Sequence, residues 1–154
     1  MKTFDVIALG ELNVDLILNR IAGFPEVGKE IFARDMICTL GSSTAIFAAN
    51  VSALGARTAF AGMIGRDAFG ELVRGSLEAR GVDTRYVIEA ADRATGVTVV
   101  MSYGEDRANV TYPGAMEALR FADLDPEIFL SARHIHLSSL FMQPGLLADI
   151  VPIL

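Results

Sequence analysis

The segment from Gly10 to Asp15 carries the strongest chemical signal in the sequence, because polar side chains follow directly after a short apolar stretch. Asn13 and Asp15 lie two residues apart, so their side chains point to the same side of an extended chain. An amide and a carboxylate together can donate to and accept from vicinal hydroxyls, which is what a polyol ligand requires. A turn in which both side chains bond their own backbone explains these residues equally well.

The segment Gly41-Ser42-Ser43-Thr44 is a second candidate for ligand binding, and an apolar helical pattern follows it. Glycine lets a ligand approach the backbone closely, and the free N–H groups at a helix start can hold an oxygen atom. Ordinary helix capping by Ser42 or Ser43 explains the same residues. No Gly-Lys-Ser/Thr follows, as it would in a phosphate-binding loop. The first strand also lacks a Gly-x-Gly-x-x-Gly after it, which disfavours a dinucleotide-dependent oxidoreductase.

The elements that must position these residues follow from apolar periodicity and from turn-forming residues. Extended segments are expected over Phe4–Leu9, Leu12–Leu18, Glu30–Leu40, Thr58–Ile64, Tyr86–Glu89, Gly96–Tyr103, Asn109–Tyr112 and Arg133–Ser138. Helices are expected from Ser42 to Leu54, from Ala68 to Arg80 with Asp67 as cap, over Pro126–Ala132, and from Leu146 to near Pro152. This order predicts a three-layer α/β domain with a β appendage.

Composition restricts the class of protein. The chain has 154 residues, which suits one domain, and is 52% hydrophobic and 21% charged, as expected of a globular protein. A net charge of -6 with scattered Lys and Arg argues against nucleic-acid binding. The lone Cys38 cannot form an internal disulfide and suits a reducing cytoplasm. The uncharged stretch from Met36 to Ala56 contains Gly41 and Asn50, so a strand and a buried helix explain it better than a membrane span.

In the order and spacing of its motifs, the chain resembles the ribokinase-like, or PfkB-family, carbohydrate kinases from its first residue to its last. The Gly10–Asp15 segment is similar to the family's sugar-binding opening, and Phe24–Glu30 is similar to the stretch that leads into its β-sheet lid. The spacing of the family's first signature is matched by Ala48, Gly55, Gly65 and the segment Asp67-Ala68-Phe69-Gly70.

The resemblance implies an incomplete three-layer ribokinase-like αβα domain with a small β-sheet lid, whose strands lie near residues 12–40 and 95–112. It implies an ATP- and Mg²⁺-dependent kinase that phosphorylates a hydroxyl of a sugar or related polyol. A homodimer through the lid is also implied. The substrate-binding residues that follow are Asn13, Asp15, Gly41, Ser42, Asn50 and Arg107.

Several positions depart from the family pattern or have a plainer explanation. Ile46 stands where the family has a sugar-binding asparagine, and Asn50, one turn further on the same helical face, is a candidate replacement. A buried asparagine bonded to backbone is the commoner role for such a residue. Arg107 resembles a lid arginine of some family members, and a solvated hairpin charge explains it equally well. His134 and His136 share a strand face, where packing is favoured over metal binding.

In the family, the catalytic base is an aspartate of a Gly-Ala-Gly-Asp-type motif in the C-terminal half, next to the nucleotide pocket. No such motif occurs in the 154 residues. We therefore expect residues 1–154 to be the N-terminal part of a kinase domain with no catalytic residue, no tight binding of ATP or Mg²⁺, and no phosphoryl transfer alone. The alternative is a non-catalytic sugar-binding or dimerising module. The identity of the sugar stays open.

Overall fold

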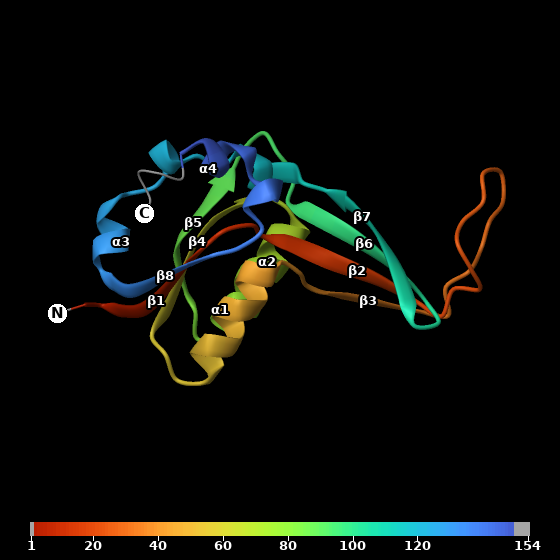
Figure 1. The fold of residues 1–154 in the computed structure, drawn as a ribbon, viewed down its shortest axis with the longest axis horizontal. Coiled ribbons are helices and arrows are strands. Elements are labelled where there is room, and N and C mark those ends of the chain that lie inside the picture. Colours follow the sequence, from red (N-terminus) through yellow and green to blue (C-terminus); the bar gives the residue numbers. More distant parts are fainter. Residues whose placement is uncertain (1, 150–154) are drawn as a thin grey trace.

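The computed structural model describes residues 2–149 and contains two four-stranded sheets (Figure 1). The first, which we call the body sheet, has the strand order β5-β4-β1-β8, and all of its neighbouring strands are parallel. Its strands are β1 (Phe4–Leu9), β4 (Thr58–Gly65), β5 (Asp83–Ala90) and β8 (Ala132–Leu137). Parallel order with intervening helices confirms the predicted α/β class.

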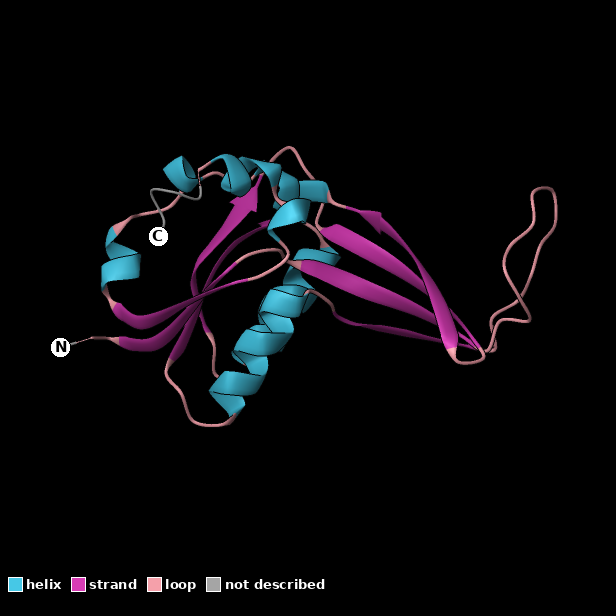
Figure 2. Ribbon diagram, viewed as in Figure 1, coloured by secondary structure: helices cyan, strands magenta, loops and turns pink. Residues whose placement is uncertain are grey.

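Helices cover both faces of the body sheet, which gives three layers (Figures 1 and 2). One face packs against α1 (Ser43–Ala53) and α2 (Ala68–Glu78) around Phe60, Val73 and Leu77. The other face packs around Ile7 and Leu9. The short elements on that side are η1 (Gly114–Ala118), η2 (Phe121–Asp123), α3 (Glu127–Leu130), η3 (Leu140–Met142) and α4 (Pro144–Ala148).

The second sheet, which we call the lid sheet, projects from one end of the body (Figure 1). Its order is β3-β2-β6-β7, formed by β2 (Asn13–Asn19), β3 (Asp35–Leu40), β6 (Gly96–Tyr103) and β7 (Asp106–Tyr112). Two antiparallel hairpins, β2–β3 and β6–β7, are joined by the parallel pair β2–β6. The two lid regions expected from the sequence therefore form one sheet.

Some element bounds differ from expectation. Residues 30–34, expected to be extended, are irregular, because the ladder between β2 and β3 ends at the pair Asn19–Asp35 and reaches no further than a hydrogen bond from the Arg34 N–H to the Asn19 carbonyl oxygen at 3.1 Å. The last helix starts at Pro144 rather than Leu146, since proline suits the first helical position. Its expected end near Pro152 lies outside the described residues. Within residues 2–149, no helix has both the length and the apolar character needed to cross a bilayer.

Candidate functional site

Asn13 and Asp15 lie in β2, where the chain leaves the body and enters the lid sheet. Asn13 is buried, and its Nδ2 donates to Asp15 Oδ1 at 3.0 Å, so the two side chains share a face as predicted. The same Nδ2 donates to Thr98 Oγ1 at 3.0 Å, and Thr98 Oγ1 lies 3.0 Å from Thr111 Oγ1. The residues thus belong to a strand rather than a turn. They begin a polar row across three strands of the lid.

Gly41 meets this pair from the start of α1. A Cβ built on Gly41 would overlap the Asp15 carboxylate and lie 2.7 Å from Asn13 Nδ2, so only a hydrogen atom fits there. The Gly41 N–H donates to the Asn13 carbonyl oxygen at 2.9 Å. The polar pair therefore lies in direct contact with the Gly41 backbone.

Ser42 is the N-cap of α1, as the capping interpretation predicted. Its Oγ accepts from the Ala45 N–H at 3.0 Å and donates to the Glu11 carbonyl oxygen at 2.7 Å. The φ of Ser42 is 70°, in the left-handed region that favours glycine, so serine is strained where the family pattern has a second glycine.

Asp15 sits in an unusual electrostatic setting. Burial raises the pKa of its carboxyl above the ordinary value, while the hydrogen bond from Asn13 and the positive charge of Arg107 oppose this rise without cancelling it. Arg107 belongs to β7 and lies on the same face of the lid sheet, because the register pairs Asp15 with Thr98 and Thr98 with Thr111. Asp15 is therefore a carboxyl whose charged form gains from a hydroxyl donor.

Asn50 lies apart from this group. It is exposed, so the expectation of a buried asparagine bonded to backbone is wrong. Ile46 and Asn50 do share a helix face, and both line a pocket of about 370 Å³. Its other lining residues are Thr39, Leu40, Ala49, Ser76, Ala79 and Arg80. Thr39 is the register partner of Asp15, but neither Asn13 nor Asp15 lines this pocket.

A buried carboxylate, Glu11, bonds to the start of α1 next to the site, and its role was not foreseen from the sequence. It accepts hydrogen bonds from Ser43 Oγ at 2.9 Å and from Thr44 Oγ1 at 2.6 Å. Ser138, just after β8, lies 2.6 Å from Thr44 Oγ1. These hydroxyls join the ends of β1 and β8 to the start of α1. The signal available in the sequence was the carboxylate within the Gly10–Asp15 segment.

Of the two histidines of β8, His136 packs against a helix, as favoured, whereas His134 is exposed. His136 stacks on Phe47 of α1 with ring centroids 3.6 Å apart and an interplanar angle of 14°. Burial, followed by the proximity of His134, lowers the pKa of His136, although Glu11 opposes the change. Among residues 2–149, no three His, Cys, Asp or Glu side chains are grouped to hold a metal ion.

Residues 3–152 match the model of the pfkB family carbohydrate kinases. The chain belongs to this family. A nucleoside kinase from Methanothermobacter thermautotrophicus is 29% identical to this PfkB-family chain over 136 residues, which cover 88% of the chain and 44% of the relative. Probable fructokinase-3 from Arabidopsis thaliana is 36% identical over 104 residues, covering 65% of the chain and 30% of the relative.

Solved structures confirm the ribokinase-like fold of this PfkB-family chain. The fructokinase from Halothermothrix orenii superposes with a TM-score of 0.81 at 25% identity, covering 97% of the chain and 51% of that protein. A putative ribokinase II from E. coli, in complex with ATP and Mg²⁺, gives a TM-score of 0.79 at 27% identity, covering 97% and 49%. The chain spans about half the length of these proteins.

Proposed function

We propose that residues 1–154 form the substrate-binding half of an ATP-dependent carbohydrate kinase that phosphorylates a sugar hydroxyl. The observation that carries the proposal is the contact of Asn13 and Asp15 with the bare backbone of Gly41, under the polar face of the lid sheet. Family membership and the matched half of the solved kinases support it.

Each proposed binding residue has a distinct role. The Asp15 carboxylate accepts a hydrogen bond from a sugar hydroxyl, and the Asn13 amide is held by Thr98 so that its oxygen can accept another. Gly41 and Ser42 let the sugar approach the start of α1. Arg107 lies on the lid face that covers the ligand, and closure of the lid excludes water.

Substrate choice depends on the pocket that Ile46 and Asn50 line. Ile46 presents an apolar wall there, and Asn50 and Arg80 lie further along its lining. Asn50 would contact the part of a substrate that reaches past Ile46. The relatives include a nucleoside kinase and fructokinases, so nucleosides and ketoses belong in one ligand screen.

ATP and Mg²⁺ are present in the solved complex of the putative ribokinase II. We propose that both bind the complete enzyme outside residues 1–154, together with the catalytic base, and that neither binds this chain tightly. ATP would supply the transferred phosphoryl group, and Mg²⁺ would offset its charge. The role of this chain is to orient the accepting hydroxyl and to shield it from water.

Thermal-shift screening of sugars and nucleosides against wild type and Asp15→Ala tests the site. Loss of a charged hydrogen-bond partner costs about 1.5–3 kcal/mol, so affinity for the stabilising ligand should fall by about 10- to 150-fold. Asp35→Ala is the matched control, since Asp35 is a lid aspartate that pairs with Arg20 at 2.7 Å. Unchanged ligand binding by Asp15→Ala would show that the proposed pocket is wrong.

A non-catalytic sugar-binding or dimerising module is the second candidate. It is favoured by the absence of a Gly-Ala-Gly-Asp-type motif from the 154 residues. Phosphoryl transfer from ATP separates the two: the chain alone should show none, whereas a protein extended along its reading frame into such a motif should phosphorylate the sugar that the chain binds. Transfer by the 154-residue chain itself would contradict the half-kinase proposal.

A homodimer through the lid and a cytoplasmic location complete the proposal. The lid leaves apolar side chains exposed on one face, namely Met36, Val110 and Tyr112, which supports an interface. The single cysteine, Cys38, is exposed and cannot pair within the chain, which suits a reducing compartment. The molar mass measured by analytical ultracentrifugation tests the dimer.

A further inference from the structure

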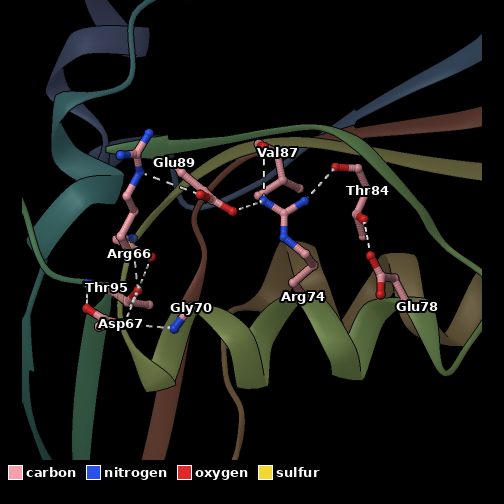
Figure 3. A network of polar contacts seen from close by, with 10 residues as sticks. Arg66, Asp67, Gly70, Arg74, Glu78, Thr84, Val87, Glu89 and Thr95 are labelled. Carbon is pink, nitrogen blue, oxygen red and sulfur yellow. Dashed lines mark hydrogen bonds and ion pairs between the residues drawn. The ribbon is translucent and has the colours of Figure 1, made fainter. Parts of the chain in front are cut away.

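Gly96 at the start of β6 and Thr95 just before it, which we call the root of β6, lie against the first turn of α2. A single carboxylate, that of Asp67, joins this root to α2 (Figure 3). Asp67 Oδ2 accepts from the Thr95 N–H at 2.8 Å. Its Oδ1 accepts from Thr95 Oγ1 at 2.8 Å and from the Gly70 N–H at 2.8 Å. Asp67 therefore caps α2, as the sequence predicted, and also holds the residue directly before β6, which the sequence did not indicate.

Thr95 is enclosed on its other side by the end of β4. It is 1% exposed, and its Oγ1 accepts from the Gly65 N–H at 2.9 Å. A Cβ built on Gly65 would lie 2.5 Å from both the Arg93 carbonyl oxygen and the Thr95 nitrogen, so the connecting loop rests directly on the Gly65 backbone. Any movement of Thr95 must break contacts with β4 and α2 together.

The element that carries Asp67 is itself fixed to the body sheet (Figure 3). Arg74 of α2 pairs with Glu89 of β5 at 2.9 Å and donates to the Thr84 carbonyl oxygen at 3.3 Å. Arg66, next to Asp67, lies 3.6 Å from the same Glu89. Asp67 is thus a point of attachment on the rigid part of the molecule.

From Thr95 the chain leads straight into the candidate site. Gly96 is the register partner of Asn13, and Thr98, three residues after Thr95, accepts the hydrogen bond from Asn13 Nδ2. The far end of the β6–β7 hairpin returns to the same root, because the Ala115 N–H donates to the Ala94 carbonyl oxygen at 2.8 Å. The position of Thr95 therefore sets the position of the polar row.

We propose that Asp67 is a positioning residue for the candidate site: by holding Thr95 it fixes the root of β6 and keeps the Asn13–Asp15 pair aligned with Gly41. Burial raises the pKa of Asp67, but hydrogen bonds from Thr95 and Gly70 lower it by more, so the carboxylate is ionised at neutral pH. The expected loosening of the lid sheet does not depend on the proposed function, whereas the expected loss of ligand affinity rests on it.

Hydrogen–deuterium exchange on the full 154-residue chain tests the effect on the lid. In Asp67→Asn, the amide oxygen can still cap Gly70, but the nitrogen that replaces Oδ2 cannot accept from the Thr95 N–H. Amides of β6 and β7 should exchange about tenfold faster, as expected when a charged hydrogen bond is lost, while amides of α2, β1 and β4 keep their wild-type rates.

Thr95→Val and Thr95→Ser form the matched pair, and they carry the test should Asp67→Asn fail to fold. Thr95→Val removes the hydroxyl and should accelerate exchange in the lid, and Thr95→Ser restores it and should return the rates to within about twofold of wild type. Unchanged lid rates would overturn the proposal. So would equal acceleration throughout β1 and β4, because it marks a loss of global stability only; the Gly65 amide is left out of this comparison, since Thr95→Val removes its acceptor directly.

The ligand identified by thermal shift provides the second readout. Its affinity should fall in Asp67→Asn and Thr95→Val and recover in Thr95→Ser. If lid exchange is faster in the variants but no screened ligand binds the wild type, the anchoring of the lid is supported and the proposed sugar-binding function is contradicted. A ligand bound equally well by all four proteins would contradict the positioning role and leave the sugar-binding proposal intact.

Discussion

The body sheet and the lid sheet each have four strands, yet they are stabilised differently. All eight residues of β4 in the body are buried, with an apolar cluster on each face of that sheet. In the lid, no residue of β7 is buried, and only the inner part of the sheet, around Leu16 and Leu40, packs against the helices. Figure 2 shows the described part of the lid projecting beyond all helices.

This difference separates two kinds of sequence requirement. The body needs apolar volume between its layers, since burial supplies the main free energy of folding. The lid needs correct attachment, because its alignment depends on hydrogen bonds and close backbone contacts at its roots, such as those of Thr95 and Gly41. Changes in the body should therefore alter global stability, and changes at the roots should alter the site first.

The largest expected effect comes from deleting a core side chain of the body. Phe60 is completely buried, so Phe60→Ala should lower the free energy of unfolding by about 3–5 kcal/mol. Val27, in the loop between β2 and β3 of the lid, is fully exposed, and Val27→Ala should change it by less than about 0.5 kcal/mol. Urea denaturation measures both values. Similar losses of stability in the two variants would contradict the conclusion that the body and the lid are stabilised differently.

Gly41→Ala should have an intermediate effect. The added methyl group overlaps Asp15 and crowds Asn13, and such overpacking costs about 1–3 kcal/mol of stability. It should also weaken binding of the screened polyol. Gly75→Ala is the control, because Gly75 lies in α2 with open space around it, and alanine should stabilise the helix by about 0.5–1 kcal/mol. A neutral Gly41→Ala would contradict the tight contact.

The smallest expected effect is a pH-dependent rise in the free energy of unfolding in Asp15→Asn. The raised pKa means that folded Asp15 holds its proton more tightly than unfolded Asp15, whose value is near 3.8. The penalty for ionisation is thus absent below that pH and develops as pH rises through the folded pKa. Urea denaturation at several pH values should show Asp15→Asn more stable than wild type at pH 7 and equal to it below pH 3.8. A less stable variant at pH 7 would count against the burial of this charge.

Local rules in the sequence were enough to predict most elements. The bounds of β6 agree with the expected Gly96–Tyr103, because a run of strand-forming residues lies there between Gly96 and Gly104. The cap of α2 by Asp67 follows from its residue type and its place before an apolar helical stripe. The same holds for Asn13 and Asp15, whose common face is a direct result of strand geometry.

The contacts that complete the site could not be predicted, because they join distant parts of the chain. Thr95 is 28 residues from Asp67, and Thr98 is 85 residues from Asn13. Nothing in the local pattern of a strand tells which threonine meets which partner. The exposure of Asn50 was missed for a similar reason. Asn50 faces the pocket beside the lid, and the helical pattern alone could not show that this side of α1 is left open.

The parallel pairing of β2 with β6 has a consequence for how the molecule folds. A two-stranded hairpin alone is marginally stable in water. The β6–β7 hairpin, in which no residue of β7 is buried, is therefore not expected to persist before it pairs with β2. Between β2 and β6 the chain forms β3, α1, β4, α2 and β5, and closing so long a loop is costly until those elements have packed. The lid is therefore completed late in refolding, and the candidate site, which needs both hairpins, is assembled only after the body has formed.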